Sequence, residues 1–312
     1  MPFRPMAAQP RGDRFSNVIR TGWKPAGPSS PDDPMITLSA FADEIATDPV
    51  EQLDVLERHG IRYLEFRSIH DTNVMKLTAA QHEGFRELLR SRGFGLSAIG
   101  SPIGKIRIDE PFEPHLAEFE RAMDLAEFYG TPRIRIFSYY MPQEPTPPPD
   151  PATFRDEVLK RMTAKVKRAE QRGLTLVLEN EKFLYGDTAD RVADLLETID
   201  SPALGHAFDP ANYLEVGQDP QAAWDRLKSR VIHFHVKDYD TTLHKNVPAG
   251  EGQGRIPELI ADAVRSGYRG FCVLEPHLVV AELTRGFTGP ERFGDAVAAL
   301  KNGLQRYNVP IA

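Results

Sequence analysis

The chain has 312 residues, of which 41% are hydrophobic and 27% charged, so it can bury a full core and is not disordered as a whole. Its formal net charge is −7 and the sequence has no dense basic block, so no nucleic acid partner is expected. No stretch approaches the ~18 apolar residues of a transmembrane helix, and no membrane partner is expected either.

Residues 1–34 combine prolines, polar residues and basic residues, and they lack the apolar region of a secretory signal. We expect a partly disordered N-terminal extension here, with an arm packed on the rest of the protein or on a neighbouring subunit as the alternative. The single cysteine, Cys272, lies in an apolar run, so the chain has no internal disulfide. A reducing cytoplasm suits this composition and is the expected location.

From Ile36 onward, short β-branched or aromatic runs alternate with longer amphipathic segments, a rhythm typical of parallel strand–helix units. Each predicted strand is followed by a predicted helix. The strands are ITLSAF from Ile36, YLEF from Tyr63, GLSAI from Gly95, RIRIF from Arg133, LTLVL from Leu174, LGHAF from Leu204, VIHFHV from Val231 and FCVL from Phe271.

The helix ends carry local markers. Asp48 before Pro49 predicts an N-cap, and Thr78 with Gln81 predicts a capping box. Further starts are predicted at Pro220 and Pro290, and left-handed C-terminal glycines at Gly60, Gly93, Gly130, Gly173 and Gly267. Eight such units predict a (β/α)8 TIM barrel of the α/β class over residues 35–312, with a doubly wound open sheet as the alternative.

Two loops differ from the short connections. The proline-rich segment 141–151 is either a surface spacer or a rim or lid of the site, because loops after strands lie on the catalytic face of a barrel. The loop 239–255 ends in AGEGQGR, whose alternating glycines resemble a phosphate cradle only weakly. We expect a mobile loop that gates the substrate.

Four chemically active side chains stand at the ends of the last four predicted strands: Glu179, Asp209, His235 and Glu275. Strand ends converge on one pocket in a parallel barrel, so these residues are expected to meet there. Singly, each could be a helix cap or a core residue. Three carboxylates and an imidazole together would repel without a cation, so we expect one divalent metal ion, with Mn²⁺ or Mg²⁺ favoured and Co²⁺ or Zn²⁺ as alternatives.

Other polar residues share the inward face of their strands or follow the strand ends, and they are candidates for substrate contact. Ion pairs among them, or a solvated loop lysine at position 105, are the alternatives. The candidates are Glu65, Arg67, Lys105, Arg135, Lys237 and His277.

The motifs LENE, FDPAN, HFHVKD and LEPH at the successive strand ends resemble the sugar isomerase and epimerase superfamily with xylose isomerase-like barrels, from Ile36 to about Leu304. The resemblance implies metal ligands at Glu179, Asp209, His235 and Glu275. Many epimerases of the family have a substrate-holding histidine three residues after the aspartate. This chain has Asn212 there, so Asn212 is a substrate-binding candidate and the substrate need not be a familiar ketose.

Endonuclease IV belongs to the same superfamily, but it needs further histidines for three zinc ions. This chain has Ser68 and Ser101 near the corresponding strand ends, and its negative charge also opposes DNA binding. We therefore do not expect a DNA repair enzyme.

The resemblance implies an isomerase or epimerase of a sugar or keto-sugar, in which Glu179 and Glu275 transfer protons through a metal-stabilised enediolate. The expected partner is a small sugar or polyol, and a homo-oligomer is left open. An inosose-type dehydratase or keto-glycoside lyase would use the same site, and a non-catalytic sugar-binding subunit is a third alternative.

Overall fold

The computed structural model describes residues 36–282 and 285–312, and the predicted N-terminal extension lies outside them. All eight predicted strands are confirmed. They are β1 (Thr37–Ala40), β2 (Tyr63–Phe66), β5 (Gly95–Ile99), β6 (Arg133–Ile136), β7 (Thr175–Glu179), β8 (Leu204–Phe208), β9 (Val231–Val236) and β12 (Phe271–Leu274).

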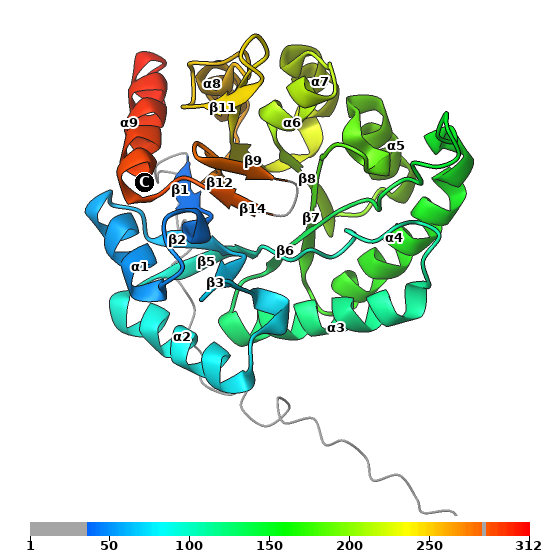
Figure 1. The fold of residues 1–312 in the computed structure, drawn as a ribbon, viewed down its shortest axis with the longest axis horizontal. Helices are drawn as coiled ribbons and strands as arrows, with labels where there is room; N and C mark the ends of the chain where they lie inside the picture. The colour runs from blue at the N-terminus through cyan, green and yellow to red at the C-terminus, as the bar shows by residue number, and fades with distance from the viewer. Residues whose placement is uncertain (1–35, 283–284) are drawn as a thin grey trace, which may run out of the picture.

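The strands form one parallel sheet in the order β1-β12-β9-β8-β7-β6-β5-β2. From β2 onward each strand pairs with its successor among these eight, and β1 pairs with β12, the last. A doubly wound sheet would instead reverse direction within the order. β1 and β2, at the two ends of this order, contact each other, so the sheet closes into a nearly complete barrel. The predicted TIM barrel is confirmed, with its helices outside the strands (Figure 1).

The helices begin and end close to the predicted markers. They are α1 (Pro49–Arg58), α2 (Ala79–Arg92), α3 (Phe112–Tyr129), α4 (Arg155–Gln171), α5 (Ala189–Ile199), α6 (Pro210–Glu215), α7 (Pro220–Leu227), α8 (Ile256–Arg265) and α9 (Pro290–Arg306). The Asp48 carboxylate accepts hydrogen bonds from the first turn of α1, and Thr78 and Gln81 form the capping box of α2. All five predicted C-terminal glycines have positive φ.

Apolar side chains fill the layer between strands and helices. Phe208 and Phe234, from adjacent strands, pack on Trp224 of α7, with ring centroids 5.6 and 5.5 Å away. The interior of the barrel is different, because Glu65, Arg135 and His235 are all buried there. Buried charges are costly unless paired, so a polar barrel interior indicates a functional centre rather than a stabilising core.

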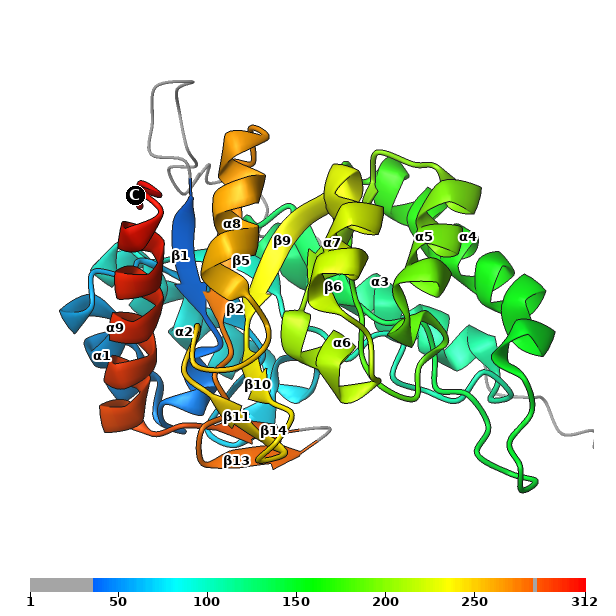
Figure 2. The ribbon, with the colours of Figure 1, turned by 90° about the horizontal axis from the view of Figure 1, so that it is seen from above.

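Short hairpins extend the carboxyl end of the barrel. They are β3 (Ser68–Ile69) with β4 (Thr72–Asn73), β10 (Asp238–Asp240) with β11 (Lys245–Val247), and β13 (Val280–Glu282) with β14 (Arg285–Phe287). In Figure 2 the last two hairpins both lie at this end. The short 3-10 helices are η1 (Ala42–Glu44), η2 (Val74–Lys76), η3 (Pro151–Phe154), η4 (Tyr185–Asp187) and η5 (Lys228–Arg230).

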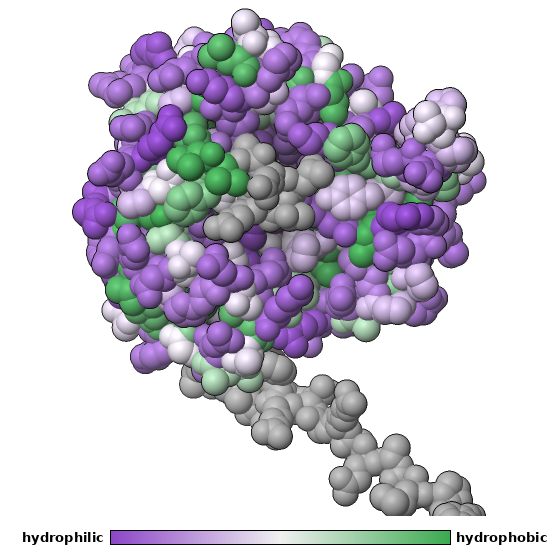
Figure 3. Space-filling view, viewed as in Figure 1, coloured by the Kyte–Doolittle hydropathy of each residue, from purple (hydrophilic) through white to green (hydrophobic). Residues whose placement is uncertain are grey.

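The polarity of the surface is as expected from the 27% of charged residues in the chain. The face seen in Figure 3 is largely hydrophilic, with hydrophobic residues in small scattered groups. Within residues 36–282 and 285–312, no helix has both the length and the apolar composition to cross a bilayer.

Candidate active site

The four predicted metal ligands come together at the carboxyl end of the barrel. Glu179 is the last residue of β7, Asp209 and Glu275 directly follow β8 and β12, and His235 lies near the end of β9. All four are buried. One donor atom from each lies within 4.8 Å of the donor atoms of the other three, which is the spacing of a metal site.

The donor atoms are not satisfied by the protein alone. His235 Nδ1 lies 3.0 Å from Glu179 Oε1 and 3.5 Å from Glu275 Oε2. Yet His235 Nδ1 and Glu275 Oε2 are buried and make no hydrogen bond, and Asp209 Oδ2 has only the Lys237 ammonium beside it, at 2.7 Å. Buried polar atoms normally have partners, so these residues fit a divalent cation that would bind all of them.

The pKa values of the carboxylates in this set also fit a bound cation. Burial raises the pKa of Asp209 to about 7, and the neighbouring Glu179 and Glu275 add to the rise although Lys237 opposes it. The pKa of Glu275 is also raised by burial, but Lys237 and His277 more than offset this and hold it well below its usual range. A bound cation would favour the ionised form of every carboxylate in the set.

Glu65 lies beneath this set rather than on a substrate-facing wall. Its Oε2 accepts hydrogen bonds from His233 Nε2 at 2.8 Å and from His235 Nε2 at 3.3 Å. Its other oxygen lies 3.6 Å from Arg135 Nε. Glu65, His233 and His235 are also spaced like metal ligands, but hydrogen bonds already occupy the facing atoms. Strand alternation predicts that Glu65 points inward but not how deep it lies.

A cavity of about 520 Å³ lies above the set and is the substrate site that the geometry favours. Of the sequence-predicted residues, eight line it: Arg67, Lys105, Arg135, Glu179, Asn212, Lys237, Glu275 and His277. Glu65, Asp209 and His235 are not among its lining residues. Sequence reasoning missed the remainder: Asn73, Met75, Lys76, Pro102, Ile103, Glu118, Arg121, Tyr140, Glu181, Lys182, Glu215 and Asn246.

Most predicted substrate-contact cations are held by carboxylates. Arg67 Nη1 lies 2.9 Å from Glu275, and Lys237 Nζ lies 2.7 Å from Asp209. Both cations therefore also hold the metal-binding carboxylates in place. Arg67 and Lys237 therefore form the expected ion pairs and also line the cavity.

Further pairs extend this network. Arg135 Nη1 lies 3.2 Å from Glu179 Oε2, and Lys105 Nζ lies 2.7 Å from Glu181 Oε2. Lys105 is thus fixed on the wall rather than freely solvated. The alternative of a solvated loop lysine is wrong.

Asn212 and His277 have partners of their own. The backbone N–H of Asn212 donates to the Asp209 carboxylate, and its side-chain amide donates to the Asn180 carbonyl at 2.7 Å. His277 Nε2 lies 3.2 Å from Glu44 and 3.4 Å from Glu275. Burial lowers the pKa of His277, but the two carboxylates outweigh it and raise the value to about 9. His277 is therefore a cation at neutral pH.

The alternating glycines bind a carboxylate of the chain itself. The buried Asp238 side chain accepts hydrogen bonds from the backbone N–H groups of Gly250, Gly252 and Gly254, at 2.8, 3.2 and 2.7 Å. A Cβ on Gly252 would lie 2.5 Å from Asp238 Oδ1, which explains glycine there. The phosphate-cradle interpretation is wrong, because these donors are already occupied.

The proline-rich loop does not reach the cavity. Tyr140 lines the cavity, but within the part of the chain that the structure describes no residue of 141–151 does so. In Figure 2 the loop that leads into α4 extends away from the barrel. The spacer interpretation is therefore favoured over a lid.

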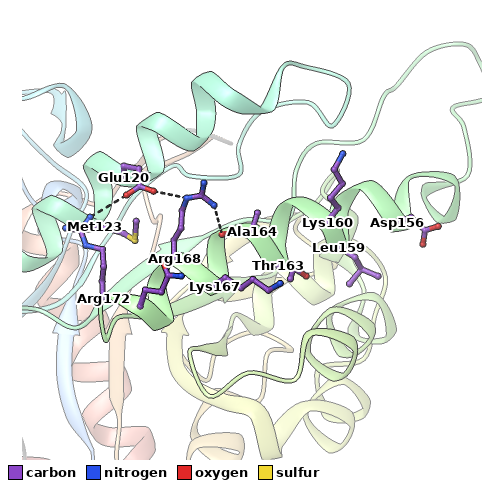
Figure 4. A pocket seen from close by; sticks show the side chains of 11 residues that line it. Glu120, Met123, Asp156, Leu159, Lys160, Thr163, Ala164, Lys167, Arg168 and Arg172 are labelled. Atoms are coloured by element: carbon purple, nitrogen blue, oxygen red, sulfur yellow. Dashed lines mark hydrogen bonds and ion pairs between the residues drawn. The ribbon is translucent and has the colours of Figure 1, made fainter. Parts of the chain in front are cut away.

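A second hollow, of about 940 Å³, lies outside the barrel between α3 and α4 (Figure 4). Its charges compensate one another: Glu120 lies 2.9 Å from Arg168 and 3.6 Å from Arg172. Among the described residues, no metal-like cluster borders it. The hollow is a surface groove remote from the carboxylate set.

The sequence profile of the family described as xylose isomerase-like TIM barrel matches residues 53–303. The chain belongs to this family. The fold and the resemblance expected from the strand-end motifs are thereby confirmed.

The chain is similar in sequence to several enzymes. It is 22% identical to 3-dehydroshikimate dehydratase of Bacillus anthracis over 213 residues, 64% of this chain and 72% of that protein. It is 26% identical to fructoselysine 3-epimerase of Escherichia coli O157:H7 over 34% of this chain and 40% of that one. It is 33% identical to 3-oxo-isoapionate decarboxylase of Pectobacterium atrosepticum over 27% of this chain and 30% of that one. The relatives are thus enzymes of differing reaction type.

Solved structures agree on the fold. A probable 3-DHS dehydratase of Bacillus anthracis has a TM-score of 0.67 at 18% identity, covering 86% of this chain and 98% of that one. A xylose isomerase-like TIM barrel protein of Mycobacterium smegmatis, in complex with magnesium, has a TM-score of 0.62 at 18% identity, covering 87% and 98%. At these identities the likeness establishes the fold alone.

Proposed function

We propose that this protein is a divalent-metal-dependent isomerase or epimerase of a keto-sugar or related keto-polyol. One observation carries the proposal: of the four candidate metal ligands, only Glu179 and Glu275 also line the cavity, whereas Asp209 and His235 do not. Two carboxylates that face both a cation and a substrate can act as the base and the acid of a proton transfer. We propose Mn²⁺ or Mg²⁺ as the cation and the cytoplasm as the location.

A divalent cation held by Glu179, Asp209, His235 and Glu275 would polarise a substrate carbonyl and so acidify the adjacent C–H bond. The protein's own contribution is to keep two bases ionised beside that bond. Burial raises the pKa of Glu179, but His235 and Arg135 outweigh it, and the pKa is lowered. Glu275 is likewise held ionised, between Arg67 and Lys237.

The reaction follows from the order of two proton transfers. One glutamate removes the proton from the carbon beside the carbonyl, and the other takes up a proton from solvent and returns it to the substrate. Return to the opposite face of the same carbon gives an epimer, and return to the neighbouring carbon gives an isomer. Arg67 and Lys237 remain paired with the carboxylates and orient them.

Dehydration is the second candidate function. The match to the dehydratase covers 64% of this chain, against 34% for the match to the epimerase. The same proton removal eliminates water when the substrate carries a hydroxyl group on the next carbon. The two candidates therefore share the first step and differ in the product.

The test is an NMR assay in D₂O with Mn²⁺-loaded protein and a panel of ketoses, inososes, 3-keto-glycosides and 3-dehydroshikimate. Deuterium incorporation with a new sugar isomer supports the proposal, and loss of water to an unsaturated product supports the dehydratase. The Asp209→Ala/His235→Ala variant, exposed to the same metal, is the control and is expected to be inactive. Absence of C–H exchange across the panel would contradict both functions.

A further inference from the structure

The cavity has the opposite sign of charge to the rest of the protein. Seven lysine or arginine side chains and five glutamates line it, an excess of two positive charges in a chain of formal charge −7. A bound divalent cation would add two more, which the buried Asp209 and Glu65 behind the wall would offset, so the excess of two positive charges would remain. A positive, partly enclosed cavity favours a negatively charged ligand.

Five of the seven cations are already paired with carboxylates. The pairs are Arg67 with Glu275, Lys105 with Glu181, Arg135 with Glu179, Lys182 with Glu215, and Lys237 with Asp209. Lys76 and Arg121 make no such pair with any residue that the structure describes. Arg121 Nη2 donates to the Leu77 carbonyl at 2.9 Å, which fixes the guanidinium and leaves its other N–H groups for a ligand.

These two cations stand on one side of the cavity. Lys76 ends η2, which follows β2 and the β3–β4 hairpin, and Arg121 lies in α3, which follows β5 and contacts η2. In the eight-strand order, β2 stands half-way around the barrel from β8 and β5 half-way from β9. The cations therefore lie across the cavity from Asp209 and His235.

Apolar side chains occupy the same side of the cavity. Met75 precedes Lys76, and Pro102 and Ile103 follow β5. A substrate that spans the cavity would place its carbonyl near the metal ligands, its carbon skeleton near these side chains, and its far end at Lys76 and Arg121.

We infer that the substrate is a keto-acid: its carbonyl binds at the metal set and its carboxylate binds at Lys76 and Arg121. This rests on the proposed function for the carbonyl end only. A planar guanidinium matches a carboxylate with two parallel hydrogen bonds. The guanidinium also matches a phosphate, but a phosphate is commonly cradled in addition by backbone N–H groups. The N–H groups of the alternating glycines beside the site are taken by Asp238.

The test uses three probes with one carbon skeleton that differ at C6: D-fructose, D-fructuronate and D-fructose 6-phosphate. Calorimetric titration of Mn²⁺-loaded protein should give D-fructuronate a dissociation constant about ten-fold or more below that of D-fructose, since a hydrogen bond to a charged group contributes this much. In the Lys76→Met/Arg121→Met variant the two constants should agree within about three-fold. The Lys160→Met/Lys167→Met variant, which removes two exposed lysines of α4 outside the cavity, should keep the wild-type preference.

Three results would overturn the inference. One is equal binding of acid and neutral sugar by the wild type, or no detectable binding of any probe at millimolar concentration. Another is an acid preference that survives Lys76→Met/Arg121→Met. The third is tightest binding of D-fructose 6-phosphate, which would assign the site to phosphate.

Failure of the proposed function would look different. Metal content and C–H exchange are measured in the same samples. A protein that binds no metal, or exchanges no C–H, yet prefers D-fructuronate through Lys76 and Arg121 retains the anion site without the proposed reaction. A protein that exchanges the substrate C–H but does not prefer D-fructuronate has the proposed reaction without the anion site.

Discussion

His235 is held between two carboxylates, with Nε2 3.3 Å from Glu65 Oε2 and Nδ1 3.0 Å from Glu179 Oε1. Burial raises the pKa of Glu65, but the two histidines outweigh it and keep this carboxylate ionised. An ionised carboxylate can only accept, so Glu65 holds a proton of His235 on Nε2. Burial lowers the pKa of His235, but Glu179 and Glu65 outweigh it and raise the pKa well above its usual value, so a metal held at Nδ1 would displace the proton there. Glu65 thus acts as a positioning residue.

Replacing Glu65 by Gln should weaken metal binding while leaving the four candidate ligands in place. Loss of a carboxylate that orients a ligating histidine typically costs about 10- to 100-fold in metal affinity. The measurement is Mn²⁺ titration by calorimetry. Ser97→Ala, which removes a buried 2.7 Å hydrogen bond to Ser39 in the same barrel, is the control and should bind Mn²⁺ normally. Wild-type affinity in Glu65→Gln would contradict the positioning role.

The purified protein should hold about one divalent ion per chain, and Asp209→Ala/His235→Ala should hold none. The barrel depends on its apolar strand–helix layer, so the double variant should keep the circular dichroism of the wild type. Elemental analysis of both proteins after Mn²⁺ loading and gel filtration is the measurement. A wild-type chain without metal would defeat the metal assignment.

Lys165 of α4 is fully buried, and its ammonium has no hydrogen-bond partner among the described residues. It lies 4.6 Å from the centre of the Tyr139 ring, and Arg161 also approaches this ring. Burial, and then Arg161, lower the pKa of Lys165 to about 7 from 10.5. The unfolded chain therefore binds more protons than the folded one between these values, and the wild type loses stability as pH falls from 10.5 to 7.

Lys165→Met should therefore be more stable than the wild type, by a margin that grows as pH falls. The gain at pH 6.5 should exceed that at pH 9.5 by on the order of 2 to 4 kcal/mol in the free energy of unfolding. Urea unfolding at both pH values is the measurement, and Lys160→Met, at an exposed lysine of the same helix, is the control. A pH-independent difference would show that Lys165 does not titrate in this range.

Asp238→Ala should release the glycine loop. The variant would lose the three hydrogen bonds that the buried carboxylate accepts from the glycines and a fourth from the Tyr239 N–H. This loss should lower the free energy of unfolding by on the order of 2 to 4 kcal/mol and speed amide exchange at Gly250, Gly252 and Gly254. Asp240→Ala is the control, because Asp240 caps only the exposed turn at Thr242 and Leu243. Unchanged exchange in Asp238→Ala would mean that other contacts hold the loop.

The fold could be predicted because its signals are local. Alternation of apolar runs fixed the eight strands, and caps such as Asp48 and Thr78 marked helix starts within a turn. The short hairpins were missed, because two- and three-residue strands carry too little pattern. Their pairing depends on contacts with the barrel end.

The candidate site was predictable only in part. Strand ends converge by topology, so Glu179, Asp209, His235 and Glu275 could be grouped from the sequence. Lys76 and Arg121 lie on a 3-10 helix and on α3, where a cation is usually solvated, and only the cavity separates them from other surface cations. The Asp238 contacts of the glycines at 250–254 could not be predicted, because this carboxylate is 12 to 16 residues away from them in sequence.

The most direct test of the central claim replaces Glu179 and Glu275 singly by Gln. With metal occupancy matched, turnover of the identified substrate should fall about 10²- to 10⁴-fold in each variant, because each loses one proton-transfer group. In D₂O, one variant should still exchange the substrate C–H without forming product, and the other should do neither, because the two glutamates serve different half-steps. Wild-type turnover by either fully metallated variant would contradict the two-glutamate mechanism.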